Sequence, residues 1–324
     1  MIIAGDIGGT KARIGLFDRR GGKVELVVSD QYASKEFTTL EGLLEAFLKA
    51  HPNAVTGPLE AACFGLPGPV INGRVRVTNL PWEVVQVDVA QRLGIGKVKL
   101  VNDLVSTAAA IPTLGESSLT TVYEGRGRVD RAGSCVVVAP GTGIGHALIH
   151  REGGWSVLLP SEGGHANFAP TTDIEIDLLR YLQPKLGHVS VESVLCGPGL
   201  VNVYSFLRDT QGSTTLIDET VSASIIATKA LEGTSPLAMR ALTLFCQILG
   251  KHCSNIVLTF LATGGVYLGG GIPPKIAPFL LQGGFLEGYL KKGKQRESVE
   301  ATPVFIVNDD HAALYGAAAI ASTL

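Results

Sequence analysis

Charge of either sign is scarce in this chain of 324 residues. Asp, Glu, Lys and Arg make up 17% of the sequence, where about 25% is typical of soluble domains. The 27 basic residues nearly balance the 29 acidic ones, so the formal net charge is −2. This balance lacks the basic excess with which proteins bind nucleic acid or anionic membranes. We therefore expect neither nucleic acid nor a membrane among the partners of this protein.

The sequence also lacks the features of secreted and membrane-spanning chains. Its five cysteines are odd in number and none forms a Cys-x-x-Cys pair, which predicts reduced, buried thiols. The acidic Asp6 falls where a signal peptide would need its apolar segment. The apolar stretch 241–266 is interrupted by Lys251, His252 and Asn255, which favours a buried helix over a membrane span. These absences predict a cytoplasmic protein.

Three common active-site motifs are missing. No Gly-Lys pair is followed by Ser or Thr, so there is no Walker loop, and neither G-x-G-x-x-G nor G-x-S-x-G occurs. Their absence argues against a P-loop nucleotidase, a Rossmann dehydrogenase and an α/β-hydrolase.

Glycine and apolar residues, by contrast, are abundant. Glycine accounts for 40 of 324 residues, or about 12%, against a usual value of about 7%. That excess indicates many turns at positive φ, or backbone left bare for a ligand. The hydrophobic fraction is 46% with a mean hydropathy of +0.29, and the length suggests about two domains. The composition is typical of a soluble α/β protein that binds ligands.

Short apolar runs alternate with helical patterns, as in α/β proteins. In the first half, the predicted strands lie at 2–5, 12–17, 23–33, 59–64 and 98–101, and the predicted helices at 40–48, 87–93 and 104–111. The second half has predicted strands at 133–139, 145–150, 155–159, 266–268 and 304–307, and predicted helices near 173–186, 198–207, 218–231, 236–261 and 310–322. A polar excursion is expected at 116–132 and a basic surface loop at 291–298. Both halves open with strand, Gly-Thr turn, strand, strand, which suggests a duplicated α/β domain with a cleft between the copies.

The two Gly-Thr turns are candidate phosphate sites. They are Asp6-Ile7-Gly8-Gly9-Thr10 and Gly141-Thr142-Gly143. Glycine-rich turns expose successive N–H groups that bind phosphate oxygens, and Asp6 could hold Mg²⁺. Glycine is also required by ordinary hairpins, so either turn alone would be equally well explained by chain geometry.

Other polar residues follow predicted strands. Asn102 and Asp103 come at the end of the strand 98–101, where α/β proteins bind ligands, although a helix N-cap would select the same residue types. Glu162 and His165 flank two glycines, and this argues against a metal-binding helix and for a turn that presents polar groups to a polyhydroxylated ligand. Glu192 taken alone is explained equally by a solvated acid.

A further glycine run, Gly269-Gly270-Gly271, follows the predicted strand 266–268. It would let a flat ring or a ribose lie against the backbone. An ordinary tight turn would use the same residues.

Together these segments resemble the hexokinase–actin–Hsp70 superfamily, and more closely the bacterial glucokinase family. The resemblance runs in order over nearly the entire chain, and the ordered set is far more specific than any single motif. The matching segments are Gly5-Asp6-Ile7-Gly8-Gly9-Thr10-Lys11-Ala12-Arg13, Leu66-Pro67-Gly68-Pro69, Thr78-Asn79-Leu80-Pro81-Trp82, Val101-Asn102-Asp103, Gly141-Thr142-Gly143, Glu162-Gly163-Gly164-His165, Gly187-His188-Val189-Ser190-Val191-Glu192, Gly197-Pro198-Gly199-Leu200 and Gly269-Gly270-Gly271-Ile272.

The resemblance implies a role for each matched residue. Asp103 would be the catalytic base for the sugar 6-hydroxyl. The sugar would be bound by Asn102, Asp103, Glu162, His165, Glu192 and Asn79. ATP would be bound by Asp6, Gly8, Gly9, Thr10, Lys11, Gly141, Thr142, Gly143, Gly269, Gly270 and Gly271, and Asp6 would hold Mg²⁺.

Two departures from the family pattern bear on these roles. Lys11 stands where a common form of the motif has Asn, which puts the phosphate contact at that position in doubt. The cysteine-rich zinc segment of the related repressor and sugar-kinase group is replaced by Asn167-Phe168-Ala169-Pro170, so no structural zinc is expected.

The resemblance also implies an architecture and an activity. It implies two α/β domains of the duplicated ribonuclease H-like, actin-like ATPase fold around a cleft, with a small domain at 1–111 and 309–324 and a large domain at 112–308. The expected reaction is ATP-dependent phosphorylation of D-glucose to glucose 6-phosphate, the first step of glycolysis, by a homodimer. A kinase for another hexose or amino sugar and a non-catalytic sugar sensor remain alternatives, and an actin-like filament protein would not need Glu162, His165 and Glu192.

Overall fold

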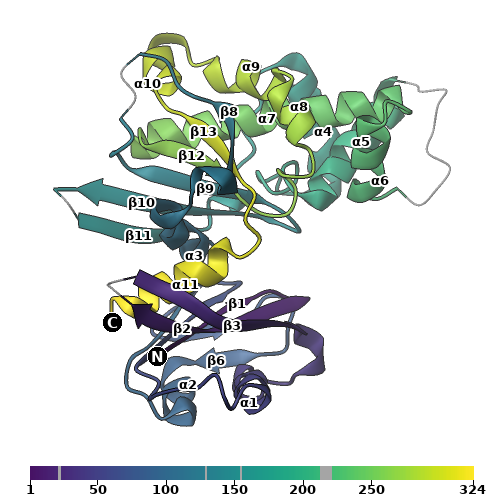
Figure 1. The fold of residues 1–324 in the computed structure, drawn as a ribbon. Coiled ribbons are helices and arrows are strands. Elements are labelled where there is room, and N and C mark those ends of the chain that lie inside the picture. The colour runs from purple at the N-terminus through teal and green to yellow at the C-terminus, as the bar shows by residue number, and fades with distance from the viewer. Residues whose placement is uncertain (21–22, 128–129, 154, 212–220) are drawn as a thin grey trace. The chain divides into compact units, whose positions relative to one another are not determined.

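The structure is a computed structural model that describes residues 1–20, 23–127, 130–153, 155–211 and 221–324 (Figure 1). It has a mixed α/β architecture and divides into two compact units. Unit 1 comprises Met1–Gly115 and Asp309–Leu324, and unit 2 comprises Glu116–Asn308. The chain therefore passes from one unit to the other twice.

Unit 1 is built on a five-stranded sheet with the order β3-β2-β1-β4-β7. The first three strands are antiparallel neighbours, and β4 and β7 add in parallel beside β1. The strands are β1 (Ile2–Ile7), β2 (Lys11–Arg20), β3 (Lys23–Ala33), β4 (Ala61–Leu66) and β7 (Val98–Asn102). Central β1 and β4 are almost wholly buried, as their continuous apolar sequences require.

Among the described residues of unit 1, four α-helices accompany the sheet: α1 (Leu40–Ala50), α2 (Gln86–Leu93), α3 (Asp103–Ala110) and α11 (Ala312–Ser322). Two 3₁₀ turns, η1 (Ser34–Glu36) and η2 (Ile111–Thr113), and a small hairpin, β5 (Arg74–Arg76) and β6 (Glu83–Val85), lie between them. The yellow α11 packs on α3, β1 and β4, so the last residues of the chain lie against the first strand (Figure 1). At this contact a Cβ on Gly316 would lie 1.7 Å from Ser106 O, so only glycine lets the two helices approach so closely.

Unit 2 is built on a six-stranded sheet with the order β11-β10-β9-β12-β13-β8. Its strands are β8 (Leu119–Tyr123), β9 (Cys135–Pro140), β10 (Ile144–Glu152), β11 (Trp155–Ser161), β12 (Gly265–Leu268) and β13 (Val304–Val307). Three consecutive antiparallel strands are followed by two parallel ones, as in unit 1. The expectation of a polar excursion at 116–132 was wrong in part, because β8 pairs antiparallel with β13.

The α-helices of unit 2 surround one large apolar cluster. They are α4 (Asp173–Leu186), α5 (Gly197–Gln211), α6 (Ala223–Leu231), α7 (Pro236–Phe260), α8 (Ala277–Leu281), α9 (Gly284–Leu290) and α10 (Arg296–Glu300), with 3₁₀ turns η3 (Glu116–Ser118), η4 (Gly163–His165) and η5 (Gly293–Gln295). The predicted basic loop at 291–298 was wrong, since it contains η5 and the start of α10. Residues 218–220 of the helix predicted at 218–231 lie outside the described residues.

The long helix α7 is the centre of this cluster and packs against α5, α6 and α9. In the described chain it is the one helix long and apolar enough to cross a membrane, and 67% of its apolar window is buried inside the protein. That burial is typical of the core helix of a globular domain.

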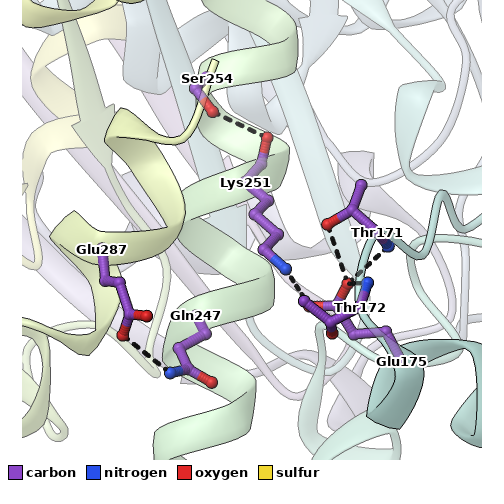
Figure 2. A network of polar contacts seen from close by, with 7 residues as sticks. All are labelled: Thr171, Thr172, Glu175, Gln247, Lys251, Ser254 and Glu287. Atoms are coloured by element: carbon purple, nitrogen blue, oxygen red, sulfur yellow. Dashed lines mark hydrogen bonds and ion pairs between the residues drawn. The ribbon is translucent and has the colours of Figure 1, made fainter. Parts of the chain in front are cut away.

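A buried ion pair joins the start of α4 to α7 (Figure 2). Lys251 Nζ lies 2.5 Å from Glu175 Oε1, and Glu175 Oε2 accepts hydrogen bonds from the backbone N–H groups of Thr171 and Thr172. Burial favours a raised pKa for Glu175, but the Lys251 ammonium and the Thr171 donors outweigh burial and hold that pKa below its usual value. The pair thus fixes the segment that leads from the Glu162–His165 turn into α4.

Candidate functional site

In unit 1, two carboxylates lie at the ends of β1 and β7, two parallel strands on either side of β4. Asp6 pairs in register with Gly65 of β4, which pairs with Val101 of β7, and Asp103 follows β7 as the first residue of α3. Because parallel strands end at the same edge of a sheet, both acids reach the edge where α/β proteins bind ligands. The structure therefore brings Asp6 and Asp103 together.

The carboxyl of Asp6 is poorly solvated. Burial, with a further contribution from the negative charge of Asp103, raises its pKa to about 6, and the nearby Arg13 only partly offsets this. A carboxylate that is desolvated and repelled by a neighbour is stabilised by any cation that approaches it. Asp6 is thus a strong candidate for a metal or proton site.

The turn between β1 and β2 is held tightly by its own backbone. Gly8 N donates to Lys11 O at 2.8 Å, and the Ser34 hydroxyl, from η1, donates to Gly8 O at 2.7 Å. Thr10 and Lys11 are exposed. The turn therefore presents Gly9, Thr10 and Lys11 to solvent on a fixed base.

Asn79 lies against this turn. It has a left-handed φ of 67°, and a Cβ on Gly9 would lie 3.1 Å from Asn79 Cβ. The structure thus places this residue, a predicted sugar ligand, beside the first phosphate turn, an association that its sequence position did not reveal.

Asn102 is the N-cap of α3. Its Oδ1 accepts a hydrogen bond from Leu104 N at 2.9 Å, and its Nδ2 donates to Gly68 O at 3.3 Å. The cap interpretation of Asn102 is therefore confirmed, and the cap aligns the helix whose first residue is Asp103. Asp103 Oδ1 also accepts from Leu104 N at 2.9 Å.

In unit 2, the turn between β9 and β10 leaves a limited set of donors for a ligand. Gly141 N donates to Gly143 O at 2.7 Å, and Ile144 N donates to Glu192 Oε2 at 3.0 Å. The N–H groups of Thr142 and Gly143 make no hydrogen bond to the described residues. These two donors and the exposed Thr142 hydroxyl are the groups that a phosphate could bind.

The glycine run Gly269–Gly271 lies beside this turn. Gly269 N donates to Val138 O at 2.9 Å, and a Cβ on Gly270 would lie 2.8 Å from Pro140 O. Gly270 also has a φ of 78°, a conformation that suits glycine. The structure therefore brings this run to the end of β9, next to Gly141, Thr142 and Gly143.

Glu162 and His165 form a turn next to Glu192. The two side chains are about two-thirds exposed, with His165 Nε2 and Glu162 Oε2 3.9 Å apart. Glu192 N donates to Gly164 O at 2.9 Å, which attaches Glu192 to the middle of the turn. The structure thus brings all three predicted sugar ligands of unit 2 together.

The donor chemistry of the site fits Mg²⁺. Within the described ranges, no group of three or more His, Cys, Asp and Glu side chains is arranged to hold a metal ion. Mg²⁺ does not need such a cage, because it is usually held by one or two carboxylates, substrate phosphates and water. The poorly solvated Asp6 beside a phosphate turn matches that requirement.

Three residues that shape the site had no role predicted from the sequence, although Arg13 and Gly197 stand in matched segments. Ser34 fixes the first turn, Arg13 faces Asp6 across the β1–β2 pair, and Gly197 N donates to Gly141 O at 2.8 Å. Only Arg13 has a detectable signal, because it stands at the same side of the hairpin as Asp6. Ser34 and Gly197 act through contacts that no local pattern encodes.

Comparisons with known proteins show the family to which this chain is similar. The family profile described as Glucokinase matches residues 3–324. The glucokinase of a Nostoc species is 33% identical over 100% of this chain and 99% of its own, and that of Cronobacter sakazakii is 34% identical over 98% and 95%. The crystal structure of a glucokinase from an Antarctic psychrotroph superposes with a TM-score of 0.88 at 30% identity, covering 100% of this chain and 99% of that one.

A more distant solved structure shares the fold. It is the ROK family glucokinase of Streptomyces griseus in complex with glucose and AMPPNP, with a TM-score of 0.63 at 21% identity over 100% and 99% of the two chains.

Proposed function

This chain belongs to the glucokinase family and is a glucose kinase, and from that premise we propose how it works: it transfers the γ-phosphoryl group of ATP to the 6-hydroxyl of D-glucose. The observation that carries the proposal is the pair of carboxylates, Asp6 and Asp103, at one sheet edge beside a glycine-rich turn. Phosphoryl transfer needs a group to orient the hydroxyl and a counter-charge for the phosphates. Asp103 can supply the first, and a cation held by Asp6 can supply the second.

Asp103 is the proposed base. As the first residue of α3, it is held by the helix that Asn102 caps, so its position is set by backbone rather than by a mobile loop. It orients the 6-hydroxyl and accepts its proton as the phosphoryl group is transferred. Precise positioning of this kind supplies much of the rate enhancement of kinases.

The proposed sugar ligands come from both units. Asn102, Asp103 and Asn79 belong to unit 1, and Glu162, His165 and Glu192 belong to unit 2. Carboxylate and imidazole groups that bind particular hydroxyls discriminate against sugars that lack them, because the site's polar groups are then left unpaired.

The two turns are the proposed nucleotide site. Gly8, Gly9, Thr10 and Lys11 of unit 1, and Gly141, Thr142 and Gly143 of unit 2, supply the donors for the phosphates. Gly269, Gly270 and Gly271 supply a bare surface for the adenosine. Lys11 adds a mobile positive charge, which suits the γ-phosphate during transfer.

Asp6 is the proposed Mg²⁺ ligand. The bound ion would neutralise charge on the β- and γ-phosphates. Asp6 itself contributes a carboxylate that burial and Asp103 leave in need of a cation.

The finer features follow from the family resemblance and the repeated strand order. We propose that each unit is a ribonuclease H-like copy, that glucose binds in a cleft between the small domain (1–111 and 309–324) and the large one (112–308), and that the enzyme is a homodimer. We place it in the cytoplasm, at the first step of glycolysis.

A coupled assay tests the proposal directly. The wild-type protein is incubated with ATP, Mg²⁺ and a panel of glucose, mannose, fructose and glucosamine, and ADP release is recorded. We expect glucose to give the highest kcat/KM and a metal chelator to stop turnover. Faster turnover of another sugar would reassign the substrate, and binding of glucose without ADP release would show a sensor.

A further inference from the structure

One carboxylate of unit 2 rests directly on the second phosphate turn. Glu192 Oε2 accepts a hydrogen bond from Ile144 N at 3.0 Å. A Cβ on Gly143 would lie 2.3 Å from the same oxygen, so this approach is possible only over glycine. Glu192 thus fixes the backbone from which Thr142 and Gly143 direct their remaining N–H groups.

The same residue is attached to the Glu162–His165 turn. Its N–H donates to Gly164 O at 2.9 Å, and a Cβ on Gly164 would lie 2.1 Å from Ile144 O. The backbone O of Glu192 accepts a hydrogen bond from Cys196 Sγ at 3.0 Å. The two turns are therefore packed on each other, with Glu192 as the residue common to both.

The carboxylate has a second oxygen to offer. Oε1 makes no hydrogen bond to the described residues, and the side chain is half-buried. A half-buried carboxylate oxygen in this state is an acceptor for a hydroxyl group. The two oxygens of Glu192 thus have different roles: Oε2 binds the phosphate turn, and Oε1 is available to a ligand.

We propose that Glu192 is a positioning residue for the nucleotide as well as a sugar ligand. Oε2 holds the Thr142 and Gly143 donors in the conformation that receives phosphate, while Oε1 accepts a hydrogen bond from a sugar hydroxyl. The sugar orders the carboxylate, and the ordered carboxylate orders the turn, so each substrate tightens the binding of the other to the same degree. This inference rests on the proposed function, because it requires a sugar at Oε1.

A competing effect has the opposite sign. The negative charge of Glu192 lies beside a phosphate site, and repulsion alone would weaken nucleotide binding. Two substitutions separate the effects. Glu192→Gln keeps an acceptor oxygen for Ile144 N and removes the charge, whereas Glu192→Ala removes both.

The experiment measures binding of AMPPNP with Mg²⁺ by isothermal titration calorimetry, first without sugar. We expect Glu192→Ala to bind AMPPNP about tenfold more weakly than wild type, since a charge-assisted hydrogen bond that orders the turn is lost. Glu192→Gln should bind it at least as tightly as wild type. The matched control is Glu152→Gln, which removes the charge of an exposed acid at the opposite end of β10 from Ile144, and its AMPPNP affinity should equal that of wild type.

The same titrations at saturating glucose measure the coupling. Glucose should tighten AMPPNP binding in wild type and in Glu152→Gln, and this gain should be lost in Glu192→Ala. If the alanine variant does not fold, Glu192→Asp withdraws the carboxylate from Ile144 N and should show the same weakening.

Failure of this inference and failure of the proposed function give different results. This inference would be overturned if Glu192→Ala bound AMPPNP as tightly as wild type or more tightly, or if the Ala and Gln variants changed AMPPNP affinity equally. The proposed function would still stand in that case, provided that the wild-type protein phosphorylates glucose. A wild-type protein that binds AMPPNP but phosphorylates no sugar would contradict the proposed function itself.

Discussion

Asp103 is fixed by an element rather than by a loop, and this gives its substitution a specific signature. Replacing it with Asn leaves the helix start and Asn102 in place, so glucose affinity should stay within a few-fold of wild type. The lost proton acceptor should lower kcat about 10²- to 10⁴-fold. The coupled assay measures kcat, and calorimetry measures glucose affinity. The control is Asp88→Asn, a substitution of an exposed acid in the first turn of α2. A near-native kcat would remove Asp103 from the mechanism.

Substituting Asp6 should increase the stability of the protein and decrease its activity. Its pKa is raised to about 6 from an ordinary 3.8, so the folded state holds the protonated form more tightly than the unfolded state does. Its contribution to stability is therefore present below pH 3.8 and lost as the pH rises through about 6. In chelator-treated buffer at pH 8, Asp6→Asn should raise the Tm by a few degrees, and the gain should vanish near pH 4.

The same Asp6→Asn protein should lose activity. We expect kcat/KM for ATP to fall by about 10²-fold or more and the Mg²⁺ concentration for half-maximal rate to rise, because the proposed ligand is gone. Titration of activity against Mg²⁺ measures both. An unchanged Mg²⁺ requirement would mean that another group holds the ion.

At the scale of elements, a buried histidine pair joins β10 to α7. His146 and His252 lie with their Nε2 atoms 2.7 Å apart. Burial lowers the pKa of His146 to about 4. Burial, then His146 and Lys292, lower that of His252 to about 3. Both rings are therefore neutral in the folded protein, while the unfolded chain takes up protons at an ordinary pKa of about 6.5.

The histidine pair should make the folded protein less stable in acid. Below about pH 6.5 the unfolded state binds more protons, so the free energy of unfolding should fall with acidification, by up to about 2.7 kcal/mol per pH unit for two groups. Urea unfolding at pH 7 and 5.5 measures this fall, which should be smaller in a His146→Leu, His252→Leu double variant. Parallel pH dependence in the two proteins would show that the pair does not titrate on unfolding.

A second prediction for α7 concerns the stability contributed by the Lys251–Glu175 ion pair. Lys251→Met leaves the buried Glu175 carboxylate without its cation and should cost about 3–5 kcal/mol of unfolding free energy. Adding Glu175→Gln removes the orphaned charge and keeps an oxygen for the Thr171 and Thr172 N–H groups, so the double variant should recover most of the loss. Denaturant midpoints at constant slope measure both variants. No recovery would mean that packing, not charge, explains the single variant.

Most elements could be predicted from local sequence, and the elements missed are short: β5, β6, β8, α8, α9 and α10. The strands 23–33 and 304–307 and the helix 236–261 match β3, β13 and, to one residue, α7, because continuous apolar runs and 3.6-residue periodicity are local signals. β8 was missed because its sequence is half polar, as befits an edge strand whose partner, β13, lies far along the chain. The short α10 was missed because its polar residues show little periodicity.

Residue types at the site could be predicted better than their neighbours. Asp6 and Asp103 were predicted from strand ends, and the two Gly-Thr turns from glycine spacing. The contacts of Glu192 with Ile144 and of Asn79 with Gly9 could not be found, since each joins segments far apart in sequence. Local patterns specify which groups are available, and tertiary packing decides which groups meet.

For the molecule as a whole, the division of proposed sugar ligands between two units predicts a response to glucose. A sugar held by Asp103 in unit 1 and Glu162 in unit 2 favours whichever arrangement lets both reach it. Small-angle scattering should therefore show a smaller radius of gyration at saturating glucose without nucleotide. The response should weaken in Glu162→Ala. An unchanged profile in wild type would mean that the units are already closed or that the ligands are misplaced.

The packing of α11 on α3, β1 and β4 has a consequence for biosynthesis. The ribosome synthesises the whole of unit 2 before Ala312–Ser322, so the first sheet emerges early but lacks its covering helix until unit 2 has been made. Domains fold as units during synthesis, and here the unit encoded first is completed last. A chain truncated after Asn308 should therefore contain a protease-resistant unit 2 beside an unprotected five-stranded sheet of unit 1, a state in which a chaperone would have most to bind.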